Sequence, residues 1–88
     1  MKKHLVITGK VQGVGFRYWI KNLAINNNIN GWVKNKMSGD VEALIIGEEK
    51  DVRKLIKLCE IGPSSATIQN IQVNDYEHDY SKEGFNIF

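Results

Sequence analysis

The chain has 88 residues, of which 42% are hydrophobic and 25% are charged, and its formal net charge is +2. A chain of this size can bury roughly 60% of its unfolded surface, so residues 1–88 are expected to form one soluble domain. Cys59 is the only cysteine and the two histidines are isolated, which excludes an internal disulfide and gives no metal-ligand spacing. Without a membrane-length apolar run or a signal-peptide segment, the sequence predicts a cytoplasmic protein.

The charges are unevenly distributed along the chain. Residues 1–39 contain seven basic side chains and no acidic one, whereas all ten acidic residues lie from Asp40 onward. A positive field raises the local concentration of anions, so the first half is a candidate for binding an anionic ligand. Solvated lysines on an ordinary surface are the alternative interpretation.

The first half of the chain predicts a strand, a helix and a hairpin. Residues 4–8 (HLVIT) are β-branched and apolar, which predicts a strand that runs into a glycine-rich loop. A helix is predicted next, ending near Asn26–Asn28, because apolar residues recur at helical spacing at Phe16, Ile20, Leu23 and Ala24. Residues 31–36 and 40–47 then predict two strands joined by a tight hairpin at Ser38-Gly39.

The second half predicts a helix and two strands. The helix is expected to begin at Glu48, Glu49 and Asp51, to end at Gly62-Pro63, and to bury Val52, Leu55, Ile56 and Cys59. Residues 66–73 read as a strand, but the apolar phase slips between Ile68 and Ile71, which indicates a bulge or an early end. Residues 85–88 (FNIF) are expected to add a short edge strand.

This order of elements predicts the fold class. A βαββαβ pattern is typical of α+β proteins with a ferredoxin-like α/β sandwich, in which two helices cover one face of an antiparallel sheet. Enzymes, RNA-binding proteins and regulatory modules all use this architecture. The function must therefore be argued from individual residues.

The glycine-rich loop before the first helix predicts an anion site. Main-chain amides of the loop from Gln12 to Phe16 can converge with the unpaired amides of the helix start, and Gly13 and Gly15 let the backbone curl around an anion. Arg17 in the first helical turn opposes the helix dipole, and an anion between them would turn that repulsion into attraction. Its guanidinium also fits two phosphate oxygens. The alternative is a tight connection with Arg17 lying along the surface.

Asn35 is the second candidate site residue. Its amide both donates and accepts hydrogen bonds without carrying charge, so it can hold a water molecule beside an anion. A turn-forming asparagine with a solvated side chain is the alternative. Trp32 is interpreted as sheet packing, and no aromatic residue is assigned to stacking on a ligand.

Two segments of the sequence resemble a known family. GKVQGVGFR and GWVKNKMSGDVE are similar, in order and spacing, to the two signatures of the acylphosphatase family, and GPSSATI and FNIF resemble its C-terminal half. The resemblance implies hydrolysis of acyl phosphates, such as acetyl phosphate or 1,3-bisphosphoglycerate, to a carboxylate and inorganic phosphate. It also implies that no metal and no other cofactor is needed.

The resemblance also assigns roles to residues. It implies that Arg17 is the catalytic arginine, that Asn35 positions the attacking water, and that the substrate-binding residues are Gln12, Gly13, Val14, Gly15, Phe16 and Arg17. We expect a monomer that binds a small-molecule acyl phosphate, with inorganic phosphate as product and competitive inhibitor, and neither nucleic acid nor membrane as a partner. Ser38 stands where the family usually has aspartate, which predicts a slightly less stable hairpin.

Neither Arg17 nor Asn35 is a nucleophile or a general base, so direct attack by water is expected, with a substrate phosphate oxygen accepting the proton.

Three other interpretations of the sequence stay open. A non-catalytic anion- or nucleic-acid-binding module would use aromatic residues on the sheet face, but the alternation of exposed aromatics found in RNA-binding domains is absent. A domain of a larger hydrogenase-maturation carbamoyltransferase is disfavoured because the domain fills these 88 residues. A structural protein without activity is the third.

Overall fold

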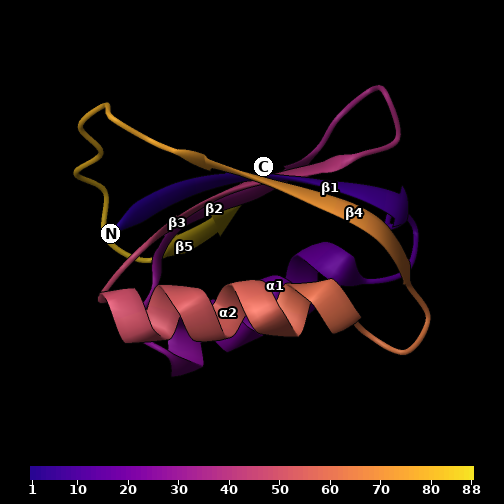
Figure 1. Cartoon of the computed structure of the whole chain (residues 1–88), viewed down its shortest axis with the longest axis horizontal. Coiled ribbons are helices and arrows are strands. Elements are labelled where there is room, and N and C mark those ends of the chain that lie inside the picture. The colour runs from indigo at the N-terminus through magenta and orange to yellow at the C-terminus, as the bar shows by residue number, and fades with distance from the viewer.

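Five strands and two helices form two layers (Figure 1). The computed structural model describes residues 1–88, with elements in the order β1 (Lys2–Lys10), α1 (Phe16–Asn26), β2 (Asn30–Asn35), β3 (Val41–Ile46), α2 (Glu49–Ile61), β4 (Thr67–Asp75) and β5 (Phe85–Ile87). The sheet order is β4-β1-β3-β2-β5, and both helices lie against one face. The predicted ferredoxin-like sandwich is confirmed. Strands β1 to β4 pair antiparallel, and β5 pairs parallel to β2, which makes the sheet mixed.

The core lies between the sheet and the helices. Alternate residues of the central strands point into it, and the helices contribute the faces that their apolar spacing predicted. Leu23 and Ile56 are only partly buried, at the margin of the core. Neither helix is long and apolar enough to cross a membrane. The buried members of the core from β1, β3, α1 and α2 are Leu5, Ile7, Val41, Ala43, Ile45, Phe16, Ile20, Ala24, Val52, Leu55 and Cys59.

The phase slip in β4 is a bulge. Thr8 pairs with Asn70, but the next residue of β1, Gly9, pairs with Ile68, so one residue of β4, Gln69, has no partner. Because of this extra residue, Ile68 and Ile71 both pack against the core although they are three positions apart. The alternative expectation of an early end is wrong, since β4 continues to Asp75.

The β2–β3 turn differs from the two-residue Ser-Gly turn that the sequence suggested. The N–H of Gly39 donates to the carbonyl of Lys36 at 3.1 Å, so Met37 and Ser38 are the central residues of the turn. Gly39 follows with a φ of 97°, a left-handed conformation that costs glycine little. A turn followed by a left-handed glycine is the usual three-residue hairpin loop, which explains the shift by one residue.

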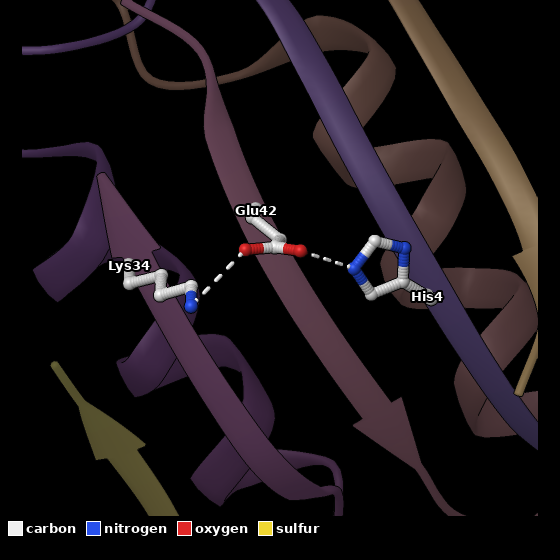
Figure 2. A network of polar contacts seen from close by, with 3 residues as sticks. All are labelled: His4, Lys34 and Glu42. Carbon is white, nitrogen blue, oxygen red and sulfur yellow. Dashed lines mark hydrogen bonds and ion pairs between the residues drawn. The ribbon is translucent and has the colours of Figure 1, made fainter. Parts of the chain in front are cut away.

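A polar network crosses the sheet face that the helices leave open (Figure 2). Glu42 on β3 lies between His4 on β1 and Lys34 on β2, with its carboxylate oxygens 2.6 Å from His4 Nε2 and 3.4 Å from Lys34 Nζ. Partial burial by itself would raise the pKa of Glu42, but the His4 hydrogen bond and the charge of Lys34 outweigh it, so the pKa lies below its ordinary value. The ionised carboxylate therefore joins three adjacent strands.

Replacing this carboxylate tests its contribution to stability. Glu42→Gln should lower the free energy of unfolding at pH 7 by about 1–2 kcal/mol, because hydrogen bonds to charged groups exceed neutral ones. The folded pKa is lowered, so the contribution is complete above the ordinary value of 4.5 and is lost as the pH falls through the folded value. Urea denaturation should show that the free energies of unfolding of the parent and of Glu42→Gln approach each other as the pH falls from 7 to 3.

The matched control is Glu49→Gln, which removes an exposed ion pair with Arg53 on α2. Exposed pairs of this kind contribute at most about 0.5 kcal/mol, and the charge of Glu49 in the first turn of α2 contributes roughly 0.3–1 kcal/mol through the helix dipole. This variant therefore gives the loss expected for an exposed carboxylate that joins no other strand. A gap between parent and Glu42→Gln that is the same at both ends of the pH range would contradict the assignment.

Candidate active site

The loop between β1 and α1 forms the floor of the candidate site. Gly13 and Gly15 have φ values of 73° and 77°, both in the left-handed region, and Gly15 is also the N-cap of α1. Residues with a Cβ rarely adopt this conformation, so the glycines allow the sharp turns that the sequence suggested. The loop is fixed on both sides by Val11 and Phe16, which are 1% exposed.

The main-chain amides of this loop have no acceptors. None of the N–H groups from Gln12 to Gly15 donates a hydrogen bond, and α1 makes its first bond from Trp19 N to the Gly15 carbonyl at 3.0 Å. The preceding amides of the helix also have no acceptor, because an α-helix supplies none for its first N–H groups and no side chain caps them here. No acidic residue lies in the first turn, and Gly15 provides no side-chain cap. The positive end of the helix dipole and a series of free donors therefore meet at one place.

Arg17 is held beside this loop by the end of the chain. Its guanidinium Nη1 donates to the main-chain oxygen of Phe88 at 3.2 Å. Phe88 in turn donates its own N–H to the carbonyl of Val33 on β2 at 2.9 Å. The parallel pairing of β5 with β2 is what brings residue 88 to the first turn of α1. This orienting contact was not predicted, because FNIF carried no signal of which strand it joins.

A cavity of about 220 Å³ brings most of the predicted residues together. Asn35, the last residue of β2, lies on its wall, and the Asn35 side-chain amide is exposed and makes no hydrogen bond within the chain. Val11 and Tyr18 also line it and were not predicted; their signal was only their position next to the motif. The lining residues are Val11, Gly13, Gly15, Phe16, Arg17, Tyr18 and Asn35.

Two of the predicted substrate-binding residues do not line this cavity. The side chain of Val14 packs against the core, and its carbonyl accepts a hydrogen bond from the Ser65 hydroxyl at 3.1 Å. Because a trans peptide unit is planar, this contact points the N–H of Gly15 away from Ser65. The side chain of Gln12 is directed toward the β2–β3 hairpin, where its nitrogen contacts two carbonyls.

The chemistry that the site offers is donation of hydrogen bonds and positive charge. No three His, Cys, Asp or Glu side chains lie close enough together to hold a metal ion. The one thiol, Cys59, is in the core, where burial and, to a smaller extent, the charge of Glu60 raise its pKa to about 12. It is therefore protonated and not a nucleophile. Loop amides, a guanidinium and a neutral amide together fit a tetrahedral oxyanion.

A larger hollow of about 670 Å³ lies along α2 and is lined by residues of that helix alone. It contains basic side chains, but no residue of either sequence motif and no glycine-rich loop. The smaller cavity is therefore the candidate active site on chemical grounds.

Comparisons with known proteins agree with this geometry. The sequence model of the acylphosphatase family matches residues 3–87. The chain is 39% identical to an acylphosphatase of Pelotomaculum thermopropionicum over 88 residues, covering 98% of this chain and 94% of the relative. The crystal structure of the Bacillus subtilis acylphosphatase superposes with a TM-score of 0.94 at 30% identity, over 99% of this chain and 97% of the other. An acylphosphatase of Coxiella burnetii superposes with a TM-score of 0.89 at 34% identity, over 99% and 90% of the chains.

The family model spans nearly the whole chain, and the relatives agree with it in sequence and in fold. The resemblance that GKVQGVGFR and GWVKNKMSGDVE indicated is thereby confirmed. The chain belongs to the acylphosphatase family, enzymes that hydrolyse the carboxyl–phosphate bond of acyl phosphates.

Proposed function

We propose that this acylphosphatase holds the phosphoryl group of its substrate in the loop from Gln12 to Arg17 and hydrolyses it without a metal. The free amides of the loop and of the first turn of α1 donate hydrogen bonds to the phosphoryl oxygens. Donors that are already in place need no reorganisation as charge develops during the reaction. This series of amides without acceptors is the observation that carries the proposal.

Arg17 supplies the positive charge. Its guanidinium presents two parallel N–H groups to two phosphoryl oxygens, which a lysine ammonium cannot do. The hydrogen bond from Nη1 to Phe88 keeps the side chain beside the loop before substrate arrives. Phosphoryl transfer depends mainly on positioning and charge neutralisation, and these are the two contributions that Arg17 makes.

Asn35 orients the attacking water. Its amide is free, exposed and on the cavity wall, so it can bind a water in line with the leaving carboxylate. A guanidinium has donors but no acceptor, and a carboxamide is not a general base, so neither residue takes the proton. A phosphoryl oxygen of the substrate accepts it. The carboxylate of a mixed anhydride leaves readily, so no general acid is required.

We further propose that the protein works as a monomer in the cytoplasm. The cavity holds both Arg17 and Asn35 of the same chain, so the proposed chemistry needs no second copy. A buried cysteine without a partner fits a reducing compartment. Binding of nucleic acid to the open sheet face is disfavoured, because the carboxylate of Glu42 lies on the middle strand of that face.

Hydrolysis of an acyl phosphate in the presence of a chelator tests the proposed function. Benzoyl phosphate should be hydrolysed at the same rate with and without EDTA, and inorganic phosphate should inhibit competitively, because the loop recognises a tetrahedral oxyanion. A phosphomonoester of similar size should not be hydrolysed, since its leaving group needs protonation. Loss of activity with EDTA, or noncompetitive inhibition by phosphate, would contradict the proposal.

Asn35→Ala should separate chemistry from binding. Loss of one preorganised polar contact in a transition state commonly lowers kcat by about 10²–10³-fold. The inhibition constant for phosphate should change little, because the amide contacts water and not the phosphoryl group. Steady-state kinetics with phosphate inhibition measures both, and a parallel loss of phosphate affinity would instead make Asn35 a phosphate ligand.

Substitution of Arg17 should affect catalysis much more than folding. Arg17→Ala should lose most activity, and Arg17→Lys should recover little of it. In phosphate-free, low-salt buffer, relief of dipole repulsion gains roughly 0.3–1 kcal/mol. Loss of the single bond to Phe88 costs a comparable ~0.5–1.5 kcal/mol, so the two effects nearly cancel. Urea denaturation should place the Ala variant within about 1 kcal/mol of the parent. Near-parental activity of the Lys variant would disprove the two-oxygen contact.

A further inference from the structure

The side chain of Gln12 joins the phosphate loop to the hairpin that carries Asn35. Its nitrogen Nε2 donates to the carbonyl of Lys36 at 2.7 Å and to the carbonyl of Asp40 at 2.8 Å. Both contacts go to carbonyl oxygens, which only accept, so the amide nitrogen and not the oxygen must face the hairpin. The two protons of one amide group are thus both used on the hairpin.

These two carbonyls lie at the point where the strand pairing stops. Asn35 and Val41 are the last registered pair between β2 and β3. One step further, the N–H of Lys36 donates to the carbonyl of Asp40 at 2.8 Å, and the turn begins. Gln12 therefore binds the residue that directly follows Asn35 and the residue that directly precedes the partner of Asn35.

No other hydrogen bond connects the two segments that make the site. Among all hydrogen bonds of the chain, only the two from Gln12 run between the loop of residues 11–15 and the hairpin of residues 36–40. The loop has its own anchors in Val11, Phe16 and the contact of Ser65 with Val14. The end of the hairpin is exposed, and without Gln12 it would be fixed to the loop only through the sheet.

We infer that Gln12 is a positioning residue for the reaction: its side chain sets the distance and orientation of Asn35 relative to the loop amides and does not contact the phosphoryl group. The inference rests on the proposed function, because it requires Asn35 to align a water with a phosphoryl group held in the loop. Displacement of a reacting group by about 1 Å can lower a rate by up to about 10²-fold. Loss of the two hydrogen bonds between Gln12 and the hairpin would move Asn35 and should therefore lower kcat.

A double-mutant cycle between Gln12 and Asn35 tests the inference. Gln12→Met keeps the length and most of the volume of the side chain but removes both donors. It should lower kcat by roughly tenfold, part of the loss that misplacement can cause, and leave the inhibition constant of phosphate within about threefold of the parent. In an Asn35→Ala background the same substitution should change kcat by less than about twofold, because the group that Gln12 positions is already gone.

Asn30→Ala is the matched control for loss of stability. The oxygen of Asn30, at the other end of β2, accepts a hydrogen bond from the N–H of Gly84 at 3.1 Å, so it also links a side-chain amide to a distant main-chain group. Denaturation should show both variants destabilised, with Gln12→Met losing about 1 kcal/mol more because it removes one hydrogen bond more. Only Gln12→Met should lower kcat. An equal loss of kcat in Asn30→Ala would mean that kcat falls because the fold is less stable, and not because Asn35 is misplaced.

The cycle also separates failure of this inference from failure of the proposed function. Gln12 acts on the loop if Gln12→Met lowers kcat tenfold in both backgrounds, or if it lowers the affinity for phosphate as much as it lowers kcat. Either result overturns the inference while the proposed function stands. If Asn35→Ala itself retains parental kcat, the role of Asn35 is wrong and the proposed function fails first. If the effects of the Gln12 and Asn35 substitutions on kcat are coupled and the inhibition constant of phosphate is unchanged, the inference and the proposed function are both supported.

Discussion

The proposed site depends on main-chain amides that have no hydrogen-bond acceptor, in the loop before α1 and in the first turn of that helix. An α-helix always leaves its first N–H groups unpaired, and here α1 starts directly after a loop whose own amides also lack partners. Most helices resolve this with a polar N-cap or an acidic first turn, but α1 has a left-handed glycine and an arginine instead. Both choices leave the positive end of the helix open. A bound oxyanion, as we propose, would satisfy these donors and neutralise the charge of Arg17 in the same place.

The rest of the fold keeps these donors in position. Val11 and Phe16 fix the two ends of the loop in the core, and the hydroxyl of Ser65 holds the carbonyl of Val14 between them. The parallel pairing of β5 with β2 brings Phe88 to Arg17. Each support comes from a different part of the sequence, so the site depends on the complete sheet. On the opposite face, Glu42 joins β1, β2 and β3, and these strands carry the loop and Asn35 to the same end of the sheet.

Local patterns in the sequence predicted the elements and the two motifs, and tertiary contacts decided the rest. Helical spacing identified the buried faces of α1 and α2, because a helix that packs one side against a sheet repeats its apolar residues with the period of the helix. The slip between Ile68 and Ile71 located the bulge, but only pairing with β1 showed that β4 continues to Asp75. Gly13, Gly15 and Arg17 led to the prediction of an anion site, because the turn that glycine permits and the charge of arginine can both be read from a short stretch of sequence. The contacts of Arg17 with Phe88 and of Gln12 with the hairpin connect distant segments, and no local pattern encodes such contacts.

Titration of ¹⁵N-labelled protein with inorganic phosphate in low-salt buffer tests the central claim most directly, because each main-chain amide reports separately. If phosphate binds in the loop, the shifts should be saturable and largest for the amides of residues 12–18, with smaller changes at the Asn35 side chain. The basic side chains of α2 (Lys50, Arg53, Lys54 and Lys57) offer a competing site for any anion drawn by charge alone. Shifts that centre on α2, or that stay unsaturated while the loop amides do not move, would contradict the account.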